Sequence, residues 1–150
     1  MRIFIPLDFS SLENEEFEPT KVFAMTPKVA KLGAEYGYDD EDCEGIAMDY
    51  AAMASCDFET NQKLGRRLVV AAEVAEDLIS NLDYDGFGSA SFKSRVTWPQ
   101  IVSLHVDASS QGDLVARAVE NESAWDELSA VYLEWFDVSE LAFVKSLMTK

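Results

Sequence analysis

The sequence predicts one α+β domain over residues 1–150, organised as a ferredoxin-like βαββαβ sandwich with an extra N-terminal strand and a C-terminal helix. Three observations predict it. The chain is 150 residues long and 48% hydrophobic, which suits one core. Segments with strand periodicity alternate with segments with helical periodicity. Without the short strand-like segment 21–26, the order is strand, helices, strand, strand, helix, strand, with helices on one face. A mixed three-layer α/β fold is the alternative.

The first strand covers residues 2–6, where β-branched and aromatic residues end at Pro6. Residues 21–26 form a second short strand. Thr26 followed by Pro27 marks the start of a helix, with threonine as the N-cap and proline at the first helical position.

A longer helix begins at Asp39 and Asp40. Its apolar residues recur every three or four positions, as on one face of a helix: Cys43, Ile46, Ala47, Tyr50, Met53 and Ala54. Cys43 and Cys56 lie 13 residues apart in this helix, or ~20 Å along its axis, which excludes a disulfide between them. Reduced thiols indicate a cytoplasmic protein.

The second half begins with a strand at residues 66–74, in which the nearly continuous apolar run 68–72 predicts a central position in the sheet. A short helix at 75–82, a loop at 83–94 and a capping box from Thr97 to Gln100 follow. Residues 102–107 alternate as a strand. The elements after it are a helix from residue 114 capped by Ser110 and Asp113, a helical turn capped by Ser123, a strand from about 130 and a final helix from 137.

Charge restricts the partners of this chain. It has 28 acidic and 12 basic residues, for a net charge of -16. Such a surface repels nucleic-acid phosphates and anionic membranes, so neither is expected as a partner. A basic protein partner or a homodimer is expected instead, and the acidic runs at 13–18 and 39–44 would face the basic partner.

His105, the sole histidine, is the first candidate site. Ser103, His105 and Asp107 alternate along one strand and therefore share a sheet face, where they could bind a ligand. The Cβ atoms of His105 and Asp107 would lie roughly 6–7 Å apart, so a water or a substrate would have to bridge the two side chains. A structural histidine, hydrogen-bonded on a partly covered sheet, is the favoured interpretation.

The segment 81–92 is the second candidate. Asn81, Asp83, Asp85 and Gly86 match the first ligand positions and the glycine of a calcium loop. Phe92 stands where the bidentate glutamate is required, and the same residue types form ordinary turns. A polar loop is favoured over a metal site.

Other chemistry has little support in the sequence. One histidine and two distant cysteines do not make a zinc site, and no Walker loop or nucleophile elbow occurs. We therefore expect no cofactor and lean towards a protein that is not an enzyme.

Several segments resemble a family of short, uncharacterised actinobacterial proteins catalogued as a domain of unknown function. They occur in the same order, at residues 1–6, 23–27, 66–74, 102–107 and 134–144. The resemblance implies one cytoplasmic domain and carries no activity.

The function therefore stays open at this point. Protein–protein contact by an acidic domain is the leading hypothesis. The alternatives are a small-molecule-binding domain or enzyme with its site on the sheet face around His105, and an acidic mimic of nucleic acid. A deep pocket at His105 would favour the small-molecule hypothesis.

Overall fold

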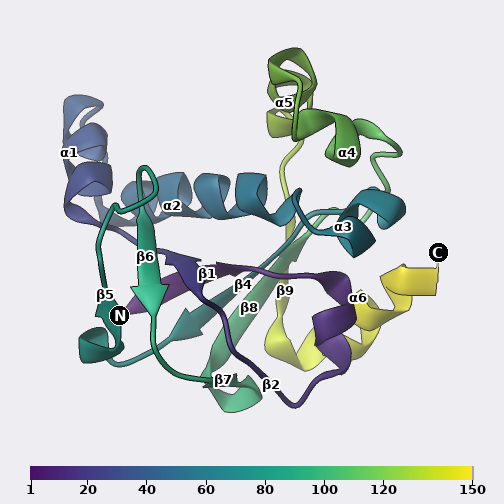
Figure 1. Cartoon of the computed structure of the whole chain (residues 1–150), viewed down its shortest axis with the longest axis horizontal. Coiled ribbons are helices and arrows are strands. Elements are labelled where there is room, and N and C mark those ends of the chain that lie inside the picture. The colour runs from purple at the N-terminus through teal and green to yellow at the C-terminus, as the bar shows by residue number, and fades with distance from the viewer. Residues whose placement is uncertain (150) are drawn as a thin grey trace.

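The computed structural model describes residues 1–149, in which one antiparallel sheet organises the chain (Figure 1). The strand order is β5-β6-β3-β1-β4-β8-β9, and all neighbouring strands are antiparallel. The strands of this sheet are β1 (Arg2–Pro6), β3 (Lys21–Phe23), β4 (Leu68–Glu73), β5 (Ile79–Ser80), β6 (Ser89–Phe92), β8 (Ile101–Val106) and β9 (Glu134–Asp137). A separate two-stranded sheet pairs β2 (Glu16–Phe17) with β7 (Val96–Thr97).

The helices connect and cover this sheet. They are α1 (Pro27–Glu35), α2 (Asp40–Ser55), α3 (Glu59–Leu64), α4 (Leu114–Ala118), α5 (Glu122–Ser129) and α6 (Leu141–Ser146). Short 3₁₀ turns cover Phe9–Glu13, Glu76–Leu78, Trp98–Gln100, Val138–Glu140 and Leu147–Thr149. The Thr26 and Asp39 side chains accept the cap hydrogen bonds of α1 and α2, which confirms both predicted helix starts.

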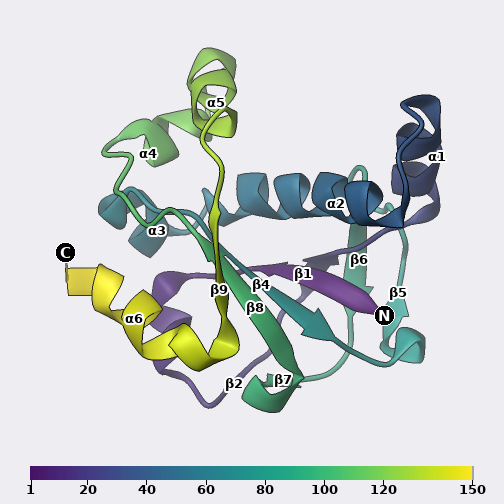
Figure 2. The same ribbon diagram turned by 180° about the vertical axis from the view of Figure 1, so that it is seen from behind.

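Helices cover both faces of the sheet, so the prediction that they cover one face was wrong. On one face, Ala47 and Ala51 of α2 pack against Phe4, Val69 and Ala71. On the other face, α6 and the Phe9–Glu13 turn close a larger core. The members of that larger core come from strands, turns and α6, and include Ile3, Ile5, Phe9, Leu12, Leu68, Val70, Leu104, Val144 and Leu147. Figure 2 shows the sheet from behind. In this view α2 lies above the central strands and α6 lies to their lower left.

The strand order also differs from that of a ferredoxin-like sandwich. In that fold the third strand lies between the first two, whereas β1 pairs directly with β4 through five residue pairs. The prediction failed because it treated segment 21–26 as decoration. β3 is in fact a strand of the main sheet, and a long crossover connection begins at its end. This connection runs through α1, α2 and α3 into β4, and β1 lies between β3 and β4 in the sheet.

The buried face of α2 is rotated from the predicted one. Its buried residues are Cys43, Ala47, Ala51, Ala52 and Ser55, whereas Met53 is 41% exposed. Small side chains let the helix backbone approach the sheet closely, and hydrophobic periodicity underweights them. The larger residues that were predicted to enter the core are Ile46, Tyr50 and Met53. They lie on the sides of the helix instead, where they line hollows.

Two segments in the middle of the chain also differ from expectation. The expected loop at 83–94 contains β6, whose Ala90 and Phe92 are buried. The expected helix at 75–82 is a 3₁₀ turn followed by β5. The small residues Ser89, Ala90 and Ser91, which come directly after Gly88, hid the strand alternation there.

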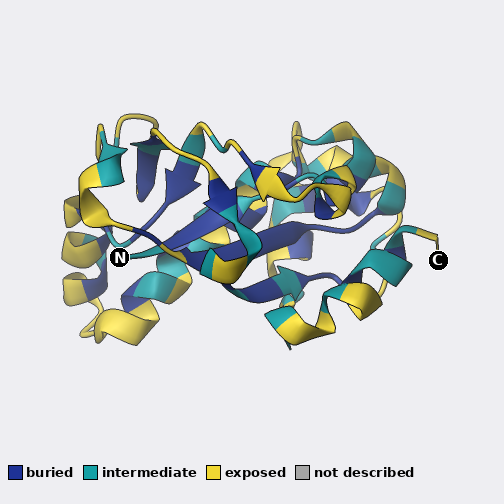
Figure 3. Ribbon diagram, turned by 90° about the horizontal axis from the view of Figure 1, so that it is seen from below, coloured by how far each residue is buried: buried dark blue, intermediate teal, exposed yellow. Residues whose placement is uncertain are grey.

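Burial follows this layering. Figure 3 shows buried strands inside and exposed surfaces on the outward sides of the helices. A small third cluster, which joins α4 and α5 to the C-terminal end of α2, comprises Cys56, Leu114, Val115, Ala124 and Leu128. Among the described residues, no helix is long and apolar enough to cross a membrane.

Candidate binding site

The sheet face beneath α2 carries the predicted histidine. His105 pairs with Val69 of β4 on one side and with Trp135 of β9 on the other, and Ser103 pairs with Ala71. Partners directly opposite each other share a face, so His105 and Ser103 lie on the face that α2 covers. Since α2 packs mainly over β1 and β4, it leaves the β8 and β9 end of this face partly open.

His105 is held by its neighbour on the strand. Its Nε2 lies 2.9 Å from the Oγ of Ser103, which is itself buried. Burial lowers the pKa of His105 to about 4, and the nearby positive charge of Arg2 adds to this effect. The ring is therefore neutral at physiological pH, and hydrogen bonding is the interaction it can offer a ligand.

Asp107 has a different partner from the one expected. Its carboxylate accepts hydrogen bonds from Arg67 Nε and Nη2, both at 2.9 Å, and from the Arg67 backbone N–H at 2.8 Å. The two side chains are 3% and 0% exposed. Arg66 donates from Nη1 to the carbonyl oxygens of Asp107 and Ala108. Arg67 thus pairs with a buried acid, whereas Arg66 fixes the backbone.

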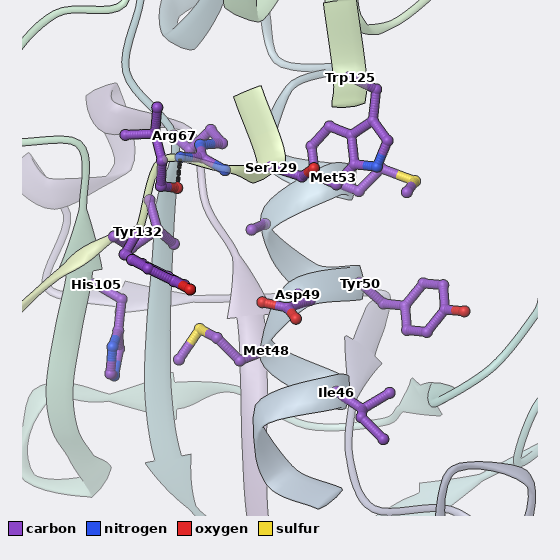
Figure 4. A pocket seen from close by; sticks show the side chains of 13 residues that line it. Ile46, Met48, Asp49, Tyr50, Met53, Arg67, His105, Trp125, Ser129 and Tyr132 are labelled. Carbon is purple, nitrogen blue, oxygen red and sulfur yellow. Dashed lines mark hydrogen bonds between the residues drawn. The ribbon is translucent and has the colours of Figure 1, made fainter. Parts of the chain in front are cut away.

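A cavity of about 450 Å³ lies between α2, α5, β8 and β9, with His105 in its wall. This volume is in the range of small-molecule sites. Figure 4 shows His105 and Tyr132 on one side of it, with Asp49 and Met48 facing them from α2. The thirteen lining residues are Ile46, Met48, Asp49, Tyr50, Ala52, Met53, Arg67, His105, Trp125, Ser129, Val131, Tyr132 and Leu133.

Arg67 presents one free nitrogen to this cavity. Its Nε and Nη2 are occupied by Asp107, and Nη2 also donates to the carbonyl oxygen of Val131 at 2.8 Å. Nη1 donates no hydrogen bond to any described residue. It is also not a buried atom without a partner, so it is accessible to solvent. Because Arg67 lines the cavity, Nη1 reaches solvent there, and the rigid ion pair with Asp107 holds it in place.

Asp49 is exposed to solvent and faces the same space from α2. Its carboxylate makes no hydrogen bond or ion pair with any residue in 1–149. Desolvation raises the pKa of Asp49, and the charge of Arg67 opposes that rise. The cavity therefore holds an unpaired carboxylate, a fixed guanidinium nitrogen and a neutral imidazole, set among Trp125, Tyr132 and methionine side chains.

Besides a hollow of about 580 Å³ at residues 18–20 and 92–95, two larger hollows of about 680 and 620 Å³ have cations that are already paired, and neither contains a histidine. In the first, Arg95 is bound to Glu16 and Glu18, and in the second, Lys21 is bound to Asp85. Their cations are therefore already paired, and the cavity at His105 is the better candidate.

Comparison with known proteins gives the family. Residues 1–144 match the model of a family of unknown function, DUF6912. The chain belongs to this family. No curated protein and no solved structure matches it significantly. The family description carries no activity, so a role for this DUF6912 member has to be argued from its cavity.

The 81–92 segment of this DUF6912 chain is a tight turn with its polar groups in use. Asp83 accepts hydrogen bonds from Thr26 Oγ1 at 2.5 Å, from Gly88 N at 2.8 Å and from Lys28 N at 3.3 Å. Asp85 pairs with Lys21, and Asn81 donates to Ser91 Oγ at 3.2 Å. Within the described residues, no group of three or more His, Cys, Asp or Glu side chains is placed to hold a metal ion.

Of the predicted residues Ser103, His105 and Asp107, only His105 lines the cavity. Sequence reasoning missed Asp49, and it assigned Arg67 no function. A signal for Asp49 was present, because it is a charged residue between Ala47 and the buried Ala51 and Ala52 of α2. If the small residues of α2 face the sheet, Asp49 lies at the border of that buried face of the helix. Nothing in the sequence indicates that residues from α2 and from β4 through α5 to β9 share one cavity.

The three tryptophans lie in different surroundings. Trp98 packs against the core and edge-on to Phe17, with ring centroids 5.0 Å apart. Trp125 is half-buried and lines the cavity, whereas Trp135 is 60% exposed on the edge strand β9.

Proposed function

We propose that this protein binds a small organic molecule in the cavity between α2, α5, β8 and β9. The observation that carries the proposal is the convergence of Arg67 Nη1, the unpaired Asp49 carboxylate and the His105 ring in one cavity of about 450 Å³. Ligand sites are mostly apolar hollows with a few well-placed polar groups and perturbed pKa values, and this cavity fits that description.

Binding is favoured over catalysis. Ser103 is the nucleophile-type residue next to His105, but it is 3% exposed and does not line the cavity. A substrate in the cavity would touch the imidazole rather than the hydroxyl oxygen. Asp107, the residue that could orient a catalytic histidine, is fully occupied by Arg67.

A fragment screen by ¹H–¹⁵N NMR tests the proposal. Fragments should shift the Trp125 indole signal and the amides of residues 48–53, while the Trp98 indole stays unchanged. Ser129→Trp should abolish these shifts because Ser129 lines the cavity. Ser123→Trp on the exposed side of the same helix is the matched control and should leave them intact. Shifts that survive Ser129→Trp, or a screen without any hit at the cavity, would overturn the proposal.

A second proposal is contact with a basic protein partner, or self-association as a homodimer. It is supported by the net charge of -16 and by the exposed acids Glu13, Glu15, Glu16 and Asp39 to Asp42. The edge strand β9 also carries the exposed Trp135, the type of aromatic residue that is common at interfaces. Analytical ultracentrifugation of the protein alone and with polylysine tests both forms. A monomer that does not bind polylysine at low salt would refute them.

A cytoplasmic location belongs with these proposals. Cys43 and Cys56 are both buried and unpaired, as expected where thiols stay reduced.

A further inference from the structure

We infer that the ligand of this cavity is a small organic cation: a protonated amine on an apolar body that also carries a neutral oxygen acceptor. The inference rests on the proposed binding function and specifies the chemical class of its ligand. Three independent features of the cavity lead to it.

The first feature is the charge of the cavity wall. Asp49 and Arg67 are the ionised side chains among the lining residues, and His105 is neutral. The charge of Arg67 is already balanced by Asp107 at 2.9 Å. What remains is the single negative charge of Asp49, in a chain whose net charge is -16. A ligand with one positive charge would compensate it, and the field of the whole molecule would attract such a ligand.

The second feature is the material around Asp49. The half-buried Trp125 and the 89% exposed Tyr132 supply aromatic rings, and Met48 and Met53 supply polarisable thioethers. Figure 4 shows Met48 next to Asp49 on α2 and Tyr132 across the cavity from both, with Trp125 and Met53 together at the α5 end. Aromatic faces attract cations, most strongly where water is partly excluded, and they are poor surroundings for an anion. An amine could therefore donate to Asp49 while its carbon body packs on these side chains.

The third feature is the fixed donor at the other end. Arg67 is 3% exposed, and its Nη1 is unpartnered at the cavity. A carbonyl or ether oxygen would accept from this nitrogen. A carboxylate would bring a negative charge into a wall that already carries one, so a neutral acceptor fits better.

Matched phenol probes test the class: tyramine and tyrosinamide as cations, 4-ethylphenol as the neutral analogue and 4-hydroxyphenylacetate as the anion. Affinities are measured by NMR titration of the Trp125 indole signal. We expect tyrosinamide to bind at least as tightly as tyramine, because its carbonyl oxygen reaches Arg67. Both should bind at least about tenfold more tightly than the neutral and anionic probes.

Asp49→Asn should reduce the affinity for both cations about tenfold or more and leave the affinity for 4-ethylphenol unchanged. Glu41→Gln removes one exposed charge from the same helix and is the matched control. It should keep the wild-type affinities.

The outcomes separate the two proposals. Equal or tighter binding of 4-ethylphenol or 4-hydroxyphenylacetate at Trp125 would overturn the cation class and leave the binding function standing. Cation affinities that Asp49→Asn does not change would do the same. If no phenol probe binds at millimolar concentration and the fragment screen is also empty at this cavity, both proposals fall.

Discussion

Asp107→Asn is expected to destabilise this protein strongly, because it breaks an ion pair that is almost completely buried. The carboxylate accepts three hydrogen bonds from Arg67, two from the guanidinium and one from the backbone, and the two side chains are 3% and 0% exposed. The amide would leave a buried guanidinium without its counter-charge. Breaking one side of a buried pair costs about 3–5 kcal/mol of unfolding free energy.

Urea denaturation followed by tryptophan fluorescence measures this loss. With an m-value of about 2 kcal/mol/M, the midpoint should fall by roughly 1.5–2.5 M. Asp113→Asn is the matched control, since it breaks the ion pair with Arg117 in which the side chains are 79% and 51% exposed. That exposed pair contributes at most about 0.5 kcal/mol, so its midpoint should barely move.

A double variant separates buried charge from lost packing. Arg67→Met combined with Asp107→Leu removes both charges and should be less destabilised than Asp107→Asn alone. The reasoning is refuted if Asp107→Asn lies within about 1 kcal/mol of the wild type, or if the double variant is the less stable of the two.

Three further predictions concern other parts of the chain. The pKa of His105 is about 4 in the folded protein, below the usual 6.5. As the pH is lowered, the unfolded chain therefore takes up this proton before the folded protein does. The free energy of unfolding should fall by about 2 kcal/mol between pH 6.5 and pH 4. This loss should be absent from the pH profile of His105→Gln, and an NMR titration that gives a pKa near 6.5 would contradict it. Asn61→Ala should lower the unfolding free energy by about 3 kcal/mol, because the buried amide accepts from Phe9 N and donates to Leu7 O and Ser55 O, each at 2.9 Å. A loss below about 1 kcal/mol in urea would show that these bonds are replaced by water. Gly65→Ala should cost at least ~2 kcal/mol more in the same assay than Gly37→Ala. Both glycines have positive φ, but a Cβ at Gly65 would lie 2.5 Å from the Gly112 carbonyl oxygen, whereas Gly37 has nothing within 4 Å; equal losses would refute this.

Local chemistry made much of the fold predictable. The N-caps Thr26 and Asp39 and the capping box at Thr97 involve residues close in sequence, and the structure has all three. The caps predicted for α4 and α5 were wrong: Asp113 makes no side-chain cap bond, Ser110 donates to the Leu64 carbonyl oxygen, and Asn121 rather than Ser123 caps α5. The alternation of β8 placed Ser103 and His105 on one face correctly. Such features depend on interactions within a few residues, which a single sequence displays directly.

Strand order and the site depend on interactions between distant segments. Whether β3 decorates the sheet or begins its crossover is decided by which edge of β1 it occupies, and no local pattern encodes that choice. Likewise, Asp107 is on the same strand as His105, but Arg67 on the neighbouring chain segment takes its carboxylate. The alanines of α2 then decide how close that helix lies to the sheet, and so where the cavity opens.

Asp49 is where stability and the proposed function oppose each other. Asp49 is exposed to solvent, but partial desolvation raises its pKa and so disfavours the ionised carboxylate in the folded protein, an effect that Arg67 offsets only in part. Since the folded pKa lies above the unfolded value, ionisation of Asp49 costs stability at neutral pH, and this cost disappears as pH falls through the folded pKa. Residues placed against the demands of folding are common at functional sites.

Asp49→Asn should therefore unfold in urea at pH 7 at the same concentration as the wild type or a higher one, while its affinity for cations falls. The stability difference between the two proteins should shrink as the pH is lowered through the raised folded pKa of Asp49, where the wild-type carboxyl group takes up its proton. A structural role for Asp49 makes the opposite prediction, namely a lower urea midpoint at pH 7. That result would mean that the carboxylate contributes to folding through a contact of its own, and the argument for a ligand charge at this position would fail.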